Sequence, residues 1–132
     1  MPRKNRENPL EAEALALAQK GIEAGARGRH AEAVEYWAAA LDYADAHLPG
    51  ADIGYWIKSG LGAALHETGD DARSIAVSRM ALDWCSARGQ PLPALTMAKS
   101  FRRLGDAESA QAYLDHARGL VGDSILREWE AG

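Results

Sequence analysis

Three stretches of the chain repeat one arrangement of apolar, small and glycine positions. The clearest copy is LGAALHETGDD, residues 61–71, and weaker copies come before and after it. Aligning the copies on their last glycine gives Gly28, Gly69 and Gly105, which are 41 and 36 residues apart. A recurrence at this spacing is typical of proteins built from stacked helical units, and it predicts three such units.

Small residues occupy the same places in all three copies. They stand seven positions before the glycine, and five and twelve positions after it: Gly21, Gly62, Ala98; Ala33, Ser74, Ala110; Ala40, Ala81, Ala117. Two antiparallel helices approach closely only when small residues face each other where the helices cross. The pattern therefore predicts a helical hairpin in each unit.

Helix-favouring residues dominate between Pro9 and Trp129, whereas Val, Ile and Thr are sparse. We expect an all-α chain with helices at about 10–26, 31–47, 53–68, 71–88, 94–104 and 107–120. Gly69 and Gly105 are expected to end helices in the left-handed conformation. Asp70, Asp71 and Asp106 are expected to cap the helices that follow.

The two ends of the chain are expected to differ from the repeats. Residues 1–8 are interpreted as a disordered tail, and residues 9–132 as a single domain with repeats at about 14–47, 53–88 and 94–121. A short amphipathic helix at about 123–130, with Ile125, Leu126 and Trp129 on one side, would cover the last apolar face. In an alternative interpretation, Trp129 is an exposed anchor for a partner.

Composition narrows the classes of function. The chain has 132 residues, a formal net charge of -4 and a single cysteine. Mild acidity argues against nucleic-acid binding, which requires a concentrated basic surface. No apolar stretch approaches the about 18 residues needed to cross a membrane, and no secretory signal is evident, so a cytoplasmic location is expected.

The sequence contains no clear pattern of residues for metal binding or catalysis. The four histidines (His30, His47, His66 and His116) do not pair at metal-ligand spacing. Cys85 is expected to be a buried, inert thiol, and Trp37 and Trp84 are expected to lie in the core. We therefore expect no catalytic residues, no cofactor and no metal, and no enzymatic activity.

Residues 14–121 resemble the tetratricopeptide repeat family. The residues that carry the resemblance are the repeated small positions above, with Leu61-Gly62 and Trp37 as the closest matches to the family signature. Ser78 and Arg118 depart from it, since they stand where an aromatic and an apolar residue are expected. The resemblance implies an α-solenoid of three hairpins that binds a protein or peptide partner.

In that family the first helix of each hairpin lines a concave groove. By this register, the predicted partner-binding residues on the second and third hairpins are Trp56, Ser59, Gly60, Ala63, His66, Glu67, Leu95, Thr96, Lys99, Arg102 and Arg103. On the first hairpin they are Leu15, Gln19 and Ile22. The groove would be apolar at one end and basic at the other, although the three basic residues could equally be a solvated face.

A narrower resemblance is to small standalone bacterial repeat proteins of the toxin-immunity type. It depends on Trp56-Ile57, Gly89-Gln90-Pro91, Leu104-Gly105-Asp106 and Tyr113-Leu114. The mechanism that it implies is occlusion of a toxin by a rigid surface. A secretion or assembly chaperone and a self-associating structural module are the alternatives. The chain is expected to be a monomer or a weak homodimer.

Overall fold

Residues 9–121 fold into six helices. The computed structural model describes residues 8–124, 126 and 127. The helices are α1 (Pro9–Ala26), α2 (His30–His47), α3 (Asp52–Glu67), α4 (Asp71–Ala87), α5 (Leu92–Arg103) and α6 (Ala107–Val121). No strand occurs in this part of the chain. The predicted all-α class is confirmed, and every helix end lies within two residues of its expected place.

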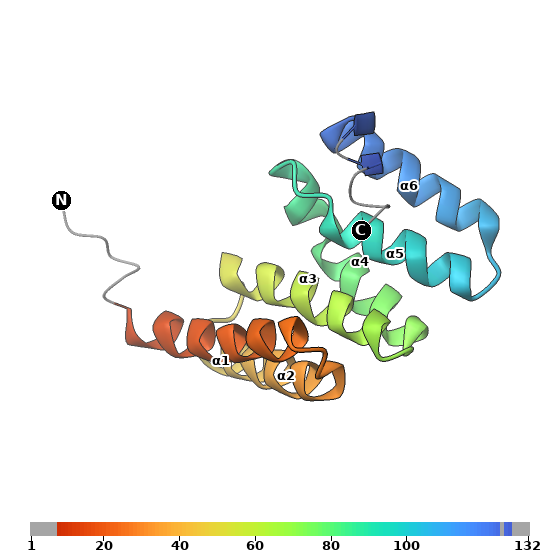
Figure 1. Ribbon diagram of the computed structural model, residues 1–132. Helices are drawn as coiled ribbons and strands as arrows, with labels where there is room; N and C mark the ends of the chain where they lie inside the picture. Colours follow the sequence, from red (N-terminus) through yellow and green to blue (C-terminus); the bar gives the residue numbers. More distant parts are fainter. Residues whose placement is uncertain (1–7, 125, 128–132) are drawn as a thin grey trace.

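The helices pack as consecutive pairs. α1 lies against α2, α3 against α4 and α5 against α6, and the pairs join through α2 with α3 and α4 with α5. Figure 1 shows the pairs following one another from the red end of the chain to the blue end. α3 also contacts both α1 and α5, so the first helices of the three pairs line up along one side. The architecture is an all-α, solenoid-like stack of hairpins.

The turns within the pairs share one construction. Gly28, Gly69 and Gly105 have φ of 77°, 87° and 87°, the left-handed conformation that glycine adopts without strain. The N–H of the next residue then reaches back to a carbonyl of the preceding helix, as in the 3.0 Å bond from Asp70 to Leu65. Asp70 and Asp106 cap the following helices through the N–H groups of Arg73 and Ser109, as predicted.

The helix crossings depend on small residues, also as predicted. Ala40, Ala81 and Ala117 are fully buried. A Cβ atom added to Gly62 would lie 2.1 Å from the hydroxyl oxygen of Ser78 on α4, which is far inside contact distance. The Ser74 hydroxyl donates to the Gly62 carbonyl at 2.7 Å, so α3 and α4 touch at this crossing.

The two ends of the chain are partly described. Residues 123, 124, 126 and 127 are helical, in the region expected to form a capping helix. Leu126 is buried in the core of the last pair, with Leu95, Ala98 and Leu114. Ile125 and Trp129 of the expected apolar side lie outside the described residues.

At the other end, residues 1–7 of the expected tail are likewise outside the described residues. Asn8, the last residue of that expected tail, is described. Its side chain caps α1 by accepting from the N–H groups of Leu10 and Glu11. In the described part of the chain, no helix combines the length and the apolarity that a membrane span requires.

Candidate functional site

A groove opens between the first and second pairs of helices, with a volume of about 450 Å³. Its lining comes from four helices: Gly21, Ile22 and Gly25 of α1, His30, Ala33 and Trp37 of α2, Gly60, Ala63, Ala64 and Glu67 of α3, and Leu92 of α5. Most of these side chains are apolar or small. The polar side chains are those of Glu67 and His30, which approach to 3.9 Å.

The floor of the groove is the indole ring of Trp37. Cβ atoms added to Gly21 and Gly60 would lie 2.8 and 2.4 Å from this ring, so both glycines let the backbones of α1 and α3 rest directly on it. Trp56 packs edge-on against the same ring, with centroids 5.5 Å apart. These contacts hold the ring in place, and the groove is therefore rigid at its base.

A second depression, which we call the tryptophan hollow, has a volume of about 280 Å³. It is lined by Glu11 and Leu15 of α1, Asp52, Ile53 and Trp56 of α3, and Trp84 of α4. Leu15 and Ile22 are seven residues apart on α1, as are Trp56 and Ala63 on α3. Seven residues are close to two helical turns, so the hollow and the groove follow one another along the same faces of α1 and α3, about 10.5 Å apart.

Several predicted partner-binding residues line these two depressions. Trp56 lines the hollow, and Ala63 and Glu67 line the groove. Leu15 and Ile22 are each 42% exposed, which is high for aliphatic side chains. The structure thus brings together the apolar residues that the sequence placed on the first and second hairpins.

Three positions predicted to face the groove, Ser59 on α3 and Leu95 and Thr96 on α5, are buried instead. Ser59 is buried at the α3–α4 contact. Burial raises the pKa of the neighbouring Cys85 thiol, and the hydrogen bond with Ser59 partly offsets this rise. Leu95 and Thr96 are only 2% and 3% exposed. α5 is enclosed by α3, α4 and α6, so most of its surface faces other helices rather than a groove.

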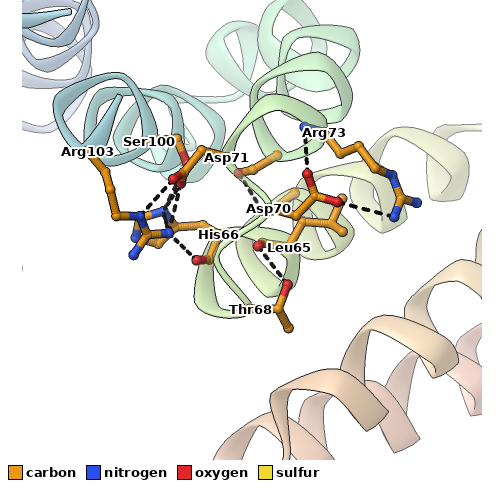
Figure 2. Close-up of polar contacts among 10 residues, drawn as sticks. Leu65, His66, Thr68, Asp70, Asp71, Arg73, Ser100 and Arg103 are labelled. Carbon is orange, nitrogen blue, oxygen red and sulfur yellow. Dashed lines mark hydrogen bonds and ion pairs between the residues drawn. The ribbon is translucent and has the colours of Figure 1, made fainter. Parts of the chain in front are cut away.

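His66 and Arg103 take part in a polar cluster instead of lining the groove (Figure 2). Arg103 donates from Nε and Nη2 to the two carboxylate oxygens of Asp71, both at 2.8 Å. The Ser100 hydroxyl donates to Asp71 Oδ1 at 2.8 Å, and Arg103 also donates to the backbone carbonyl of His66. The Nδ1 atom of His66 lies 2.9 Å from the Ser100 hydroxyl. The cluster therefore ties α3, α4 and α5 together.

The cluster shifts the pKa values of its members. Asp71 is 6% exposed, and the hydrogen bond from Arg103 lowers its pKa to about 2 although burial acts in the opposite direction. The pKa of His66 is lowered, first by burial and then by the positive charge of Arg103. The paired carboxylate in turn raises the pKa of Arg103. At neutral pH the cluster is an Asp–Arg ion pair beside a neutral imidazole.

Asp71 is the residue that sequence reasoning misassigned, since it was expected to cap α4. Figure 2 shows the capping residue Asp70 turned toward Arg73, while Asp71 points across to α5. Two consecutive aspartates after the turn glycine were a visible signal that one of them has another role. Of the remaining basic candidates, Arg102 is exposed, and Lys99 is half-buried on the same stripe of α5 as Leu92.

Trp84 also differs from its expected place in the core. It is half-buried, it stacks on Tyr55 with centroids 6.1 Å apart, and its indole N–H donates to Asp52 at 3.0 Å. The guanidinium of Arg88 lies 3.9 Å from the ring centroid. Trp37 and Cys85 are buried, as predicted.

No group of three or more potential metal ligands is found within the described residues. The sequence matches no protein-family model and no curated protein.

Proposed function

We propose that this protein is a non-enzymatic scaffold of the tetratricopeptide type, which binds a segment of another polypeptide along α1 and α3. The observation that carries the proposal is a pair of neighbouring depressions along α1 and α3: the groove, which has Trp37 as its floor and the exposed Ile22 in its wall, and the tryptophan hollow, which has the exposed Leu15 in its wall. Exposed aliphatic side chains beside an aromatic floor are typical of surfaces that partners cover.

The dimensions and the rigidity of the groove support a peptide ligand. A volume of about 450 Å³ lies within the range of about 300–1,000 Å³ typical of small-molecule sites, so the groove has room for side chains of a bound segment. Because the glycine contacts already hold Trp37 in place, binding would not have to order the floor. Preorganisation of this kind increases affinity by lowering the entropy lost on binding.

The narrower form of the proposal is a cytoplasmic immunity protein that occludes a toxin. The sequence motifs at Trp56-Ile57 and Leu104-Gly105-Asp106 support it. The alternatives remain a chaperone that holds an extended segment and a module that associates with itself. Light scattering after size exclusion separates these alternatives, since a monomer that captures one stable partner supports occlusion and a concentration-dependent dimer supports self-association.

The test is to capture partners from the native cell with the unchanged protein and with a variant that carries a charged residue in the groove, and to compare the amounts recovered. Ala63→Glu places a carboxylate beside Trp37 and should lower recovery of a specific partner by roughly tenfold or more, the loss typical of a central interface position. The matched control is Met80→Glu, because Met80 is an exposed apolar residue on α4 that does not line the groove. Circular dichroism would verify that both variants stay helical.

If Ala63→Glu and Met80→Glu recovered the same proteins in the same amounts, binding would lie on another surface. A measured turnover that survives purification would contradict the non-enzymatic proposal.

A further inference from the structure

The tryptophan hollow differs chemically from the groove beside it. Its walls are apolar or aromatic, from Leu15, Ile53, Trp56 and Trp84, but two carboxylates, Glu11 and Asp52, also line it. No basic residue lines it. An apolar depression with negative charge and no positive charge in its lining is complementary to a long side chain that ends in a cation.

Both carboxylates can receive a further partner. Glu11 forms no ion pair with any described residue. Asp52 accepts the indole N–H of Trp84, and its second oxygen lies 3.8 Å from Arg88. The Asp52 side chain is nevertheless 74% exposed, so lone pairs on its oxygens face solvent. Arg88 lies outside the hollow, so Glu11 and Asp52 are the charged residues of its lining.

We propose that the tryptophan hollow selects a lysine or arginine side chain of the segment bound along α1 and α3. This inference depends on the function proposed above and specifies the ligand. The aliphatic stem would pack on Leu15 and Trp56, and the cationic head would meet Glu11 and Asp52. Amphipathic basic side chains combine these two properties, and their cations are also attracted to tryptophan rings.

A purely apolar side chain is a poorer occupant. It would cover the same walls but would remove water from the carboxylates without replacing the lost hydrogen bonds, which is unfavourable. The groove, which is lined mainly by small and apolar residues, suits an apolar side chain instead. The residues that line the two depressions repeat about 10.5 Å apart along α1 and α3, close to the roughly 9.3 Å rise of one three-residue turn of a polyproline II segment, in which residues three positions apart point to the same side. The bound segment should therefore carry a basic and an apolar residue three positions apart.

The experiment uses short alanine–serine peptides that contain Lys and Leu three positions apart, in both orders. In the matched peptides norleucine replaces Lys, which retains the stem and removes the charge. Binding to the full chain is followed by NMR through the indole N–H signals of Trp56 and Trp84. In one of the two orders, the lysine peptide should shift both signals at millimolar concentration. Norleucine in place of Lys should weaken binding by roughly two- to fivefold, the range of an exposed cation–aromatic contact.

Two variants identify the source of the selectivity. Glu11→Gln should lower the affinity for the lysine peptide toward that for the norleucine peptide, because one of the two carboxylates of the hollow is lost, and it should leave the norleucine peptide unaffected. Glu13→Gln makes the same charge change two positions along α1, about 200° around the helix, and should change neither affinity.

Equal affinity for the lysine and norleucine peptides would overturn the inference while leaving apolar binding in the groove intact. If no peptide shifted the indole N–H signals of Trp56 or Trp84, the inference would also be overturned. The capture experiment with Ala63→Glu would still test the proposed function independently. Equal weakening by Glu11→Gln and Glu13→Gln would show a diffuse charge effect rather than a site in the hollow, and so would contradict it.

Discussion

The ion pair between Asp71 and Arg103 should couple the second and third helical pairs by about 1–2 kcal/mol. The two residues come from α4 and α5 and meet through two parallel hydrogen bonds. The test is a double-mutant cycle with Asp71→Asn, Arg103→Gln and the combined variant. Asparagine has the size of aspartate, and glutamine is a shorter polar replacement for arginine; both remove the charge, so the departure from additivity measures the pair itself.

The magnitude follows from the pKa of Asp71. A fall from 3.8 to about 2 corresponds to somewhat more than 2 kcal/mol, at about 1.36 kcal/mol per pKa unit. Arg103 is 47% exposed, so solvent screens part of the attraction and the expected coupling is smaller. Arg103→Gln alone should be more costly than the coupling energy suggests, because it leaves the carboxylate of Asp71 buried without its cation.

The assay is urea unfolding followed by circular dichroism at pH 7, with the denaturant slope compared among variants because repeat proteins can unfold in steps. The control cycle is Asp70→Asn with Arg73→Gln, an exposed pair 3.5 Å apart on one turn of helix. Its coupling should be about 0–0.5 kcal/mol. Equal coupling in the two cycles, or a value below about 0.5 kcal/mol for Asp71 with Arg103, would refute the reasoning.

Replacing two glycines of α3 by alanine should change stability in opposite directions in thermal or urea unfolding. Gly62→Ala should lower stability by about 1–3 kcal/mol, because the added Cβ atom overpacks against Ser78. Gly54→Ala should raise stability by about 0.5–1 kcal/mol, because its added Cβ atom would have no neighbour within 4 Å beyond the adjacent helix backbone and alanine favours the helix. Equal effects of the two substitutions would contradict the crossing geometry. The lowered pKa of His66 means that the folded state favours the neutral ring. The stability that the neutral His66 contributes is therefore present above about pH 6.5 and is lost as the pH falls through the pKa of the folded state. An NMR titration of its imidazole should therefore give a midpoint below 6.5, and His66→Asn should reduce the loss of stability between neutral and mildly acidic pH; a midpoint at or above 6.5 would contradict the cluster.

The local sequence was sufficient to predict where the helices and the turns lie. A left-handed residue is needed wherever a helix ends and the chain reverses, and glycine supplies it at Gly28, Gly69 and Gly105. Small residues at Gly62 and Ala81 are required because neighbouring backbones approach there. These requirements recur in every pair of helices, so the pattern was visible without the structure.

The position of each side chain around α5 was not predictable in the same way. A helix with one buried face shows that face as a periodic stripe, and the stripe on α3 correctly placed Trp56 and Ala63. α5 has helices on several sides, so Leu95 and Thr96 are buried although the stripe placed them toward the groove.

The sequence by itself thus determined that the chain forms hairpins of helices and where each hairpin turns. The tertiary structure decided which of two adjacent aspartates caps α4 and which joins the pairs. Asp70 and Asp71 have the same side chain, and either could accept a backbone N–H near the start of a helix. Arg103 is 32 residues further along the chain, and only the packing of α5 against α4 brings its guanidinium to Asp71. Local preferences are set by a few neighbouring residues, whereas an ion pair between two helices depends on where distant parts of the chain meet.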